Sequence, residues 1–451
     1  VSFNYNDQPL REENKGENIF YEDDSVEMRE LIDQRGHTSN SGNGIAASIN
    51  YSEPVLENFT LNLRHSYQRS KNESDKQTNR FNPVTGDYDI KDSVFTNEFV
   101  NTIESHNPGL FLQFQRNKLH WALGAGMQYI SQENISTQEV ATLKQDFINF
   151  APSVSLGYNF SKTFNIELYY NGRNQQPSIQ QLQPVPDNRN PLYVILGNPD
   201  LQPSFYHSFH INARQTSGTS FWHATLNVNT VMRQIIAETF FDEFGRQVSR
   251  PVNVNGNYNL SWNLNNSKTW KTKHSSFRFK IGNRGNYSNN TTFTNKVKNQ
   301  ANVYSLSPVL SLNLTWKQIF AIQPSFNMRY NFARYTLTNV QDVQYNTKRL
   351  NVTMFWNYPK RLILENSLNY NYNSRTAPGF RKGVAMWSAA INWQLFDKQQ
   401  ATIRLAVYDI LKQNLGIYRS ITQTYIEDNQ SQVLQQYFLL SFIYNLRRFG
   451  G

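Results

Sequence analysis

The residues that could carry chemistry in this chain of 451 residues are scattered rather than grouped. Among its eight histidines, His207 and His210 are three positions apart and point to opposite faces if they share a strand. His207 and His223 could approach each other from neighbouring strands, but no third ligand is in view. We therefore predict no metal site and no cofactor.

Acidic and nucleophilic residues form no catalytic pattern either. The acidic run Glu22, Asp23 and Asp24, followed by Glu27 and Glu30, lacks the glycine of a calcium-binding loop, which favours a solvated loop. No Ser/His/Asp order, phosphate-binding loop or dinucleotide fingerprint stands in a strand–turn–helix context. A hydrolase stays open as the enzymatic alternative without a nucleophile motif to support it, so we predict that the protein is not an enzyme.

The composition is polar and at the same time rich in aromatic residues. Hydrophobic residues make up 38%, charged residues 17% and aromatic residues 14%, whereas soluble domains carry about 25% charged residues. Disordered chains lack aromatics, so this chain is expected to fold. It contains no cysteine, which excludes disulfides and thiol chemistry. No apolar run approaches the about 20 residues that a membrane helix needs.

The net charge of +10 does not indicate nucleic-acid binding. A nucleic-acid interface gathers basic residues in one stripe or block. Here lysine and arginine are dispersed along the whole chain, and we expect no nucleic-acid partner.

The dominant pattern is an alternation of apolar and polar residues with a period of two. Every odd position from Leu119 to Tyr129 is apolar, and segments 164–171, 320–330 and 350–358 alternate in the same way. Successive side chains of a strand point to opposite faces. Each segment therefore presents one apolar and one polar face.

Three features favour a membrane barrel over a soluble sandwich. The segments are about 10 residues or longer, as a tilted membrane-spanning strand requires. Aromatic residues stand at the ends of the apolar faces, as membrane girdles do: Tyr158, Phe160, Trp316, Trp356, Tyr358 and Trp393. The polar faces are too polar for a dry core, where each unpaired group costs about 1–3 kcal/mol. The sequence predicts an all-β, antiparallel transmembrane β-barrel in the cell outer membrane.

The connections predict the orientation and the strand number. Very short turns alternate with longer connections, which we expect to be outer loops, at 8–37, 73–94, 138–147, 179–203, 241–250 and 291–300. About 18 strands follow, of which the first, at 1–6, looks incomplete. Either they close alone as a porin-sized barrel, or N-terminal strands absent from residues 1–451 complete a larger one. We favour the second reading, because Val1 begins inside a strand.

Residues 173–204 carry a motif with a family resemblance. The element Gly197, Asn198, Pro199, Asp200, Leu201, Gln202 and Pro203 resembles the signature of TonB-dependent outer-membrane receptors, with Ser204 where a glutamate is usual. The flanking segments resemble the outer membrane protein β-barrel family common in Bacteroidetes: 181–184, 187–192, 407–414 and 437–446. The resemblance covers roughly the last 280 residues well and the rest by pattern alone.

The resemblance implies a 22-strand barrel, an N-terminal plug domain and a segment that contacts TonB, so this chain would be the barrel domain without the plug and first strands. It implies import of a scarce ligand of siderophore, glycan or peptide class. The alternatives left open are a passive porin and a structural or anchor barrel of a surface complex. The expected partners are outer-membrane lipid and lipopolysaccharide, TonB through the plug, and a surface lipoprotein.

The resemblance leaves the ligand-binding residues unknown. In the signature, Gly197 permits a sharp turn while Pro199 and Pro203 restrict the backbone, which is a structural role. Ligand contact by Asn198 or Asp200 is the alternative. The weak candidates for stacking on a sugar or siderophore ring are loop aromatics that could equally serve loop packing: Phe20, Tyr21, Tyr193, Phe240, Phe241 and Tyr425. The charged sets Glu167/Arg173 and Glu365/Arg375 could line the lumen or pair with the plug.

Overall fold

The structure, a computed structural model, consists almost entirely of strands. It describes residues 1–22, 25–93, 96–136, 142–182, 187–190, 193–242, 246–317, 319–337, 341–376, 381–396, 399–414, 417–421, 426–430 and 433–445. The long strands are β1 (Ser2–Glu22), β2 (Ser25–Leu56), β3 (Phe59–Asn82), β5 (Asn97–Arg116), β6 (Leu119–Ser136), β7 (Thr142–Asn159), β8 (Phe164–Gln175), β11 (Ser204–Ser217), β12 (Ser220–Met232), β15 (Asn257–Lys271), β16 (Ser275–Thr294), β17 (Val297–Trp316), β18 (Phe320–Tyr335), β19 (Val343–Trp356), β20 (Leu362–Asn373) and β21 (Gly383–Leu395). The shorter elements are β4 (Asp87–Lys91), α1 (Ile179–Leu182), β9 (Asp187–Asn190), β10 (Tyr193–Ile195), β13 (Gln234–Phe241), β14 (Gln247–Val254), β22 (Ala401–Tyr408), β23 (Ile417–Ile421), β24 (Ile426–Gln430) and β25 (Tyr437–Tyr444).

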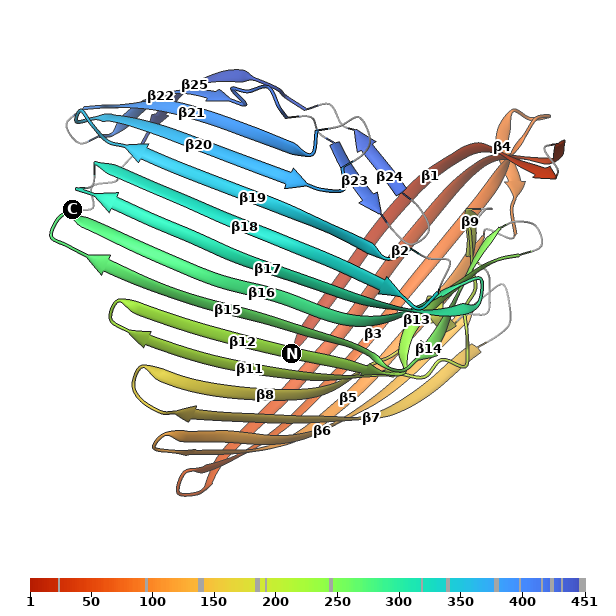
Figure 1. Cartoon of the computed structure of the whole chain (residues 1–451). Coiled ribbons are helices and arrows are strands. Elements are labelled where there is room, and N and C mark those ends of the chain that lie inside the picture. Colours follow the sequence, from red (N-terminus) through yellow and green to blue (C-terminus); the bar gives the residue numbers. More distant parts are fainter. Residues whose placement is uncertain are drawn as a thin grey trace.

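Eighteen strands form one curved wall by successive antiparallel pairing (Figure 1). The order is β1, β2, β3, β5, β6, β7, β8, β11, β12, β15 to β22 in sequence order, then β25. The expected fold class and the expected number of strands are confirmed. Within the described residues, no pairing joins β1 to β25.

The wall has an apolar outer face and a polar inner face. Large apolar side chains on the outer face are 43–49% exposed at Leu63, Leu110, Leu123, Ile281 and Leu310. Leu63 pairs with Leu110 across the β3–β5 ladder, so their side chains share one face. Such exposure of apolar surface suits hydrocarbon. The buried apolar side chains of the described residues are few and mostly small, so there is no dry sandwich core. No helix in the described part of the chain is long and apolar enough to span a bilayer.

Two aromatic belts border the apolar outer face. Near the tight turns, rings are in contact at Phe59–Phe114 (4.8 Å), Phe114–Trp121 (5.5 Å), Trp270–Phe277 (5.4 Å) and Phe320–Trp356 (5.8 Å). Farther along the strands, a second belt includes Tyr67–His106 (4.9 Å), Tyr258–Tyr287 (5.5 Å) and Tyr287–Tyr304 (4.4 Å). From Phe59 to Tyr67 the chain rises about 26 Å at about 3.3 Å per residue, which matches the roughly 25 Å apolar band of outer-membrane barrels.

Tight turns close the hairpins at one end of the wall, gathered on one side of Figure 1. Asn58 (φ 69°), Asn117 (φ 52°) and Gly218 (φ 48°) stand in these turns with left-handed backbone. Asparagine and glycine tolerate this conformation, which two-residue hairpin loops require. These turns were predicted correctly, whereas the turn between β15 and β16 was missed.

Several connections predicted as outer loops are strands instead. β1 and β2 stay paired from Ser2↔Ala46 to Glu22↔Ser25, so most of 8–37 is a long hairpin. β3 and β4 occupy much of 73–94, and β16 and β17 meet at a two-residue turn within 291–300. Beyond the membrane, both faces of a strand meet water. The sequence there no longer alternates between apolar and polar residues, although the backbones of neighbouring strands still pair.

Candidate ligand site at the barrel mouth

The segment between β8 and β11 folds against the inner side of the wall. It contains α1, β9 and β10. Its apolar anchors are buried, with Leu182 1% and Leu201 4% exposed and Pro177 below 2%. β10 pairs in parallel with β14, the second strand of the β13–β14 hairpin. The chain here is therefore packed structure rather than a free loop.

Asn198 of the signature ties three parts of this segment together. Its N–H donates to the Gln181 carbonyl (2.6 Å), and its side-chain Nδ2 donates to the Pro251 carbonyl (2.9 Å). Its Oδ1 accepts the N–H of Asp200 (3.1 Å). Asn198 is only 8% exposed, while Asp200 is exposed. Both side-chain polar atoms of Asn198 are thus engaged inside the protein.

A second clamp holds the end of the signature to the β13–β14 hairpin. Asn253 Oδ1 accepts the N–H of Gln202 (2.8 Å), and Asn253 Nδ2 donates to the carbonyls of Gln202 (2.9 Å) and Arg233 (2.7 Å). The Ser204 hydroxyl also donates to the Arg233 carbonyl (2.9 Å). Sequence reasoning missed Asn253, because nothing in its local pattern distinguishes it from other strand asparagines.

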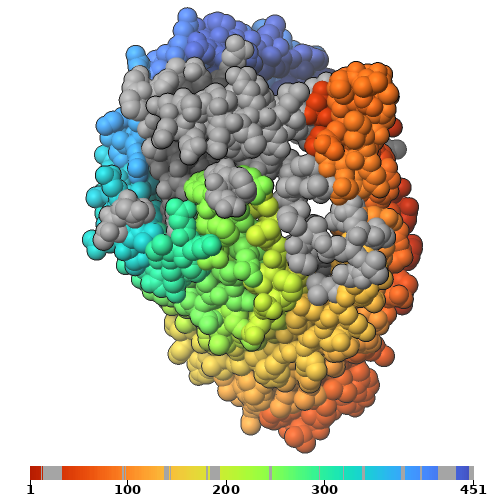
Figure 2. Space-filling view, turned by 90° about the vertical axis from the view of Figure 1, so that its right-hand side faces the viewer, coloured from red at the N-terminus to blue at the C-terminus, as the bar shows by residue number. Residues whose placement is uncertain are grey.

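A cavity of about 530 Å³ lies between this segment and the inner face of the wall. Its wall comes from β1, β2, β3, β5 and β6, and residues 176–178 form the opposite side. It lies beyond the Tyr67–His106 belt, at the end of the barrel away from the tight turns. Figure 2 looks onto this end and shows it hollowed beside the orange part of the chain, where β3 lies.

The cavity wall is built from rows of residues that face each other across neighbouring strands. One row runs Asn6, Gly42, Asn72 and Asn101 through the registers of β1, β2, β3 and β5. The next row outward contains Asn40, Ser74 and Phe99. Neighbouring strands are about 4.8 Å apart, so Asn72 and Asn101 are direct neighbours in the first row, while Gly42 separates Asn72 from Asn6. No sequence motif signals these rows, since the pairing alone aligns them.

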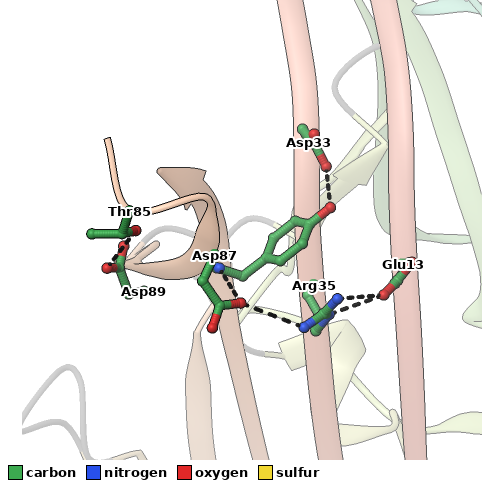
Figure 3. A network of polar contacts seen from close by, with 7 residues as sticks. Glu13, Asp33, Arg35, Thr85, Asp87 and Asp89 are labelled. Carbon is green, nitrogen blue, oxygen red and sulfur yellow. Dashed lines mark hydrogen bonds and ion pairs between the residues drawn. The ribbon is translucent and has the colours of Figure 1, made fainter. Parts of the chain in front are cut away.

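A polar network stiffens the projecting tip of β1 to β4 (Figure 3). Arg35 on β2 donates to Glu13 on β1 through Nε (3.0 Å) and lies 3.7 Å from Asp87. Its guanidinium also covers the Tyr88 ring at 4.3 Å, and the Tyr88 hydroxyl donates to Asp33 (2.6 Å). These contacts hold β4 to the hairpin that carries the cavity wall farther down.

Arginines of the inner face on β16, β18 and β19 hydrogen-bond to neutral groups. Arg284 donates to Asn263 (3.3 Å), Arg329 to Ser307 (3.1 Å) and Arg349 to Asn371 (2.9 Å). Among the described residues, none of these three guanidinium groups lies within 4.0 Å of a carboxylate. This side of the lumen is therefore basic, while the cavity side is neutral.

The aromatic ligand candidates do not form one site. Tyr193 is half-buried in β10, Phe240 lies under the Lys296 ammonium (4.2 Å), and Phe241 is 61% exposed. Phe20 and Tyr21 belong to the far end of β1, where the structure describes the backbone alone, and Tyr425 lies outside the described residues. None of the three described candidates lines the cavity.

The structure does not bring His207 and His223 together, and it pairs Glu365 with an arginine on the inner face. His207 and His223 belong to opposite faces: the Tyr170 hydroxyl lies 3.0 Å from His207 Nδ1, and Asn212 Oδ1 lies 2.8 Å from His223 Nε2. Glu365 forms an ion pair with Arg404, because the strand register places Arg404 two strands away on the same inner face.

Glu167 and Arg173 each contact a tyrosine side chain. Glu167 accepts the Tyr169 hydroxyl (3.0 Å), and Arg173 covers the Tyr206 ring at 4.9 Å. In the described part of the chain, no group of three or more His, Asp or Glu side chains is arranged to hold a metal ion. Within the predicted acidic run, Asp23 and Asp24 lie outside the described residues.

Comparison with known proteins gives a family and several distant structures. The chain matches the sequence model of the outer membrane protein beta-barrel family over residues 1–296 and 273–444. No curated protein matches it. The structure of the copper transporter OprC shares 10% identity and a TM-score of 0.48, over 81% of this chain and 56% of that one. The FpvAI–pyocin S2 complex shares 9% identity and a TM-score of 0.44, over 98% and 52%. The ferripyoverdine receptor of Pseudomonas aeruginosa shares 7% identity and a TM-score of 0.37, over 98% and 70%.

Proposed function

This chain belongs to the outer membrane protein beta-barrel family, and on that basis we propose that it is the barrel of a TonB-dependent receptor that imports a scarce ligand. The chain spans 56% and 52% of the first two structures it resembles, so the activity proposed is that of the whole protein. Its place is the outer membrane, where the apolar face contacts lipid.

The observation that carries the proposal is the organisation of the mouth. The segment with the receptor-like signature packs inward, and its neighbours 176–178 form one side of a 530 Å³ cavity. Clefts of about 300–1,000 Å³ are the usual size for small-molecule sites. A receptor that captures a scarce solute needs such a site at its outer end, whereas a passive pore does not.

The proposal includes further strands and a plug domain. β1 and β25 each have a neighbour on one side only within the described residues. In hydrocarbon, an unpaired edge costs several kcal/mol for each unsatisfied backbone group. Additional strands paired to these edges would complete a 22-strand barrel, a size whose lumen holds a plug. TonB would act on the plug, and the protein would work by binding and transport without catalysis.

Uptake with and without TonB tests the proposal. Deleting the gene for this protein is expected to abolish growth on one limiting nutrient, chosen from iron, glycan and peptide sources, and deleting TonB is expected to have the same effect. Uptake that continues without TonB would show a passive porin. Unchanged uptake of every nutrient after deletion of the gene would favour a structural barrel that anchors a surface complex.

A further inference from the structure

Uncharged polar side chains and apolar side chains such as Phe99, Ile103 and Ile130 line the cavity at the mouth. Its polar lining consists of amides and hydroxyls, with one carboxylate, Glu73, which forms an ion pair with Lys71. No lysine, arginine or histidine is among the lining residues. Anionic iron complexes would need cationic groups, and a bare metal ion would need carboxylate or imidazole ligands. The described lining therefore offers neither class a set of its usual partners.

One amide side chain that lines the cavity is buried, and its carbonyl oxygen accepts no hydrogen bond. Asn101 is 7% exposed, and its Oδ1 has no hydrogen-bond partner. Buried polar atoms are nearly always paired, because leaving one unpaired costs about 1–3 kcal/mol. Asn101 stands at the β5 end of the row Asn6, Gly42, Asn72 and Asn101 and borders the cavity. A donor group from a bound molecule would supply the missing partner.

Amide side chains match the hydroxyl groups of a carbohydrate. Each amide offers donors and an acceptor, and each hydroxyl also donates and accepts. The rows of β1, β2, β3 and β5 present Asn6, Asn72 and Asn101 on one face, with Gln132 of β6 beside them at 4% exposure. Phe99 in the next row adds an aromatic ring on which a sugar ring can stack.

From this lining we infer that the cavity binds a neutral carbohydrate, at an amide row formed by Asn6, Asn72 and Asn101 with Phe99 as its stacking platform. The inference rests on the proposed function, since the carbohydrate would be the imported ligand. It also explains why the signature segment is anchored so firmly, because Asn198 and Gln181 hold the side of the cavity opposite the amide row.

Gly42 offers a variant that reshapes the cavity while leaving the fold intact. A Cβ at Gly42 would lie 2.6 Å from Oδ1 of Asn72, the free end of a flexible side chain, so Asn72 must turn out of its row. Gly44 lies two positions away on the same strand and face, but its added Cβ would meet nothing closer than 3.6 Å. Gly44→Ala is therefore the matched control for Gly42→Ala.

Asn101→Leu separates a ligand contact from a structural role. If the amide stabilised the fold, its removal would lower the free energy of unfolding. The unpaired buried acceptor of Asn101 carries a desolvation cost that no hydrogen bond offsets, so an apolar group of similar size should cost little stability there. We expect Asn101→Leu to keep the unfolding midpoint and to lose carbohydrate binding.

The test uses the full-length protein in lipid nanodiscs and a panel of neutral di- to tetrasaccharides, with ferric siderophores and acidic oligosaccharides as comparison probes. At least one neutral oligosaccharide should bind saturably. Gly42→Ala and Asn101→Leu should weaken it by about tenfold or more, the size expected for one lost hydrogen-bonding group. Gly44→Ala should bind like the unchanged protein.

Three results would overturn the inference: no saturable binding by any neutral oligosaccharide, equal affinity in all variants, or preference for the siderophores or acidic sugars. TonB-dependent uptake of a siderophore would reject the carbohydrate while leaving the proposed function in place. Saturable oligosaccharide binding with TonB-independent uptake would instead support the site and reject the importer.

Discussion

Single residues at the mouth act by satisfying backbone groups of other segments. Asn198 bridges Gln181, Pro251 and Asp200, and Asn253 bridges Gln202 and Arg233. The structural reading of the signature predicted restricted backbone at Gly197, Pro199 and Pro203. The contacts also explain why an asparagine suits position 198, because the Asn198 side chain joins the segment to the β13–β14 hairpin.

Removing the Asn198 side chain should loosen the mouth. In Asn198→Ala the Pro251 carbonyl and the Asp200 N–H lose their partner inside the protein, so we expect a loss of about 1–3 kcal/mol in the free energy of unfolding. Denaturant unfolding in lipid vesicles measures it. Asp200→Ala, at an exposed neighbour, should change the same quantity by less than about 0.5 kcal/mol. Equal effects of the two substitutions would refute the role given to Asn198.

Few functional side chains could be identified from the sequence. Tyr193 and Phe241 are ligand candidates as aromatics in expected loops, whereas the polar lining of the cavity comes mainly from strand residues such as Asn72 and Asn101. Asparagine is abundant in this chain, and the residues of the amide row are far apart in sequence. Only the register of β1, β2, β3 and β5 brings them into one line, and register across long hairpins has no local signature.

At the scale of elements, the alternating segments predicted the membrane part of the wall well. Segments 119–129 and 320–330 lie within β6 and β18, and segment 350–358 overlaps β19 up to Trp356. The apolar face points outward, as at Leu123, Phe326 and Trp356. The pattern exists there because lipid and lumen impose different demands on the two faces. It ends at the Tyr67–His106 belt, and the strands beyond were mistaken for loops for that reason.

Close packing of Trp262 over Gly285 shows how a strand pair is stabilised on the lipid side. The two residues face each other across the β15–β16 ladder, and Trp262 Nε1 donates to Asn283 Oδ1 (2.8 Å). A Cβ at Gly285 would lie 1.9 Å from the indole ring. The ring thus covers the backbone at Gly285, which has no side chain to cover it. Aromatic rings pack over glycines in this way in other sheets.

Gly285→Ala should destabilise the barrel by about 1–3 kcal/mol, because the indole must leave its position. The free energy of unfolding in vesicles is again the measure. In a Trp262→Leu background the clash is relieved, so the same alanine should cost much less. A penalty that stays the same in both backgrounds would show that the indole contact is not its cause.

At the scale of the whole molecule, the wall separates two solvents. Lipid contacts the outer face between the aromatic belts, and the inner face carries the amide rows on one side and Arg284, Arg329 and Arg349 on the other. Fold class and outer-membrane location were predictable, since the alternation recurs along nearly the whole chain. The inner hairpin β13–β14 was not, because it has no lipid contact to impose an alternation, although β13 pairs briefly with β16.

Oxygen accessibility of spin labels along β6 tests the two-solvent wall most directly. The chain has no cysteine, so single cysteines can be introduced at positions 121–128 of the full-length protein in lipid vesicles. Labels at 123, 125 and 127 should collide often with oxygen dissolved in the bilayer, and labels at 122, 124, 126 and 128 rarely, with a period of two. Collision rates with oxygen that do not alternate along β6, or labels at 123, 125 and 127 that contact water instead of lipid, would contradict a wall with lipid on one face and water on the other.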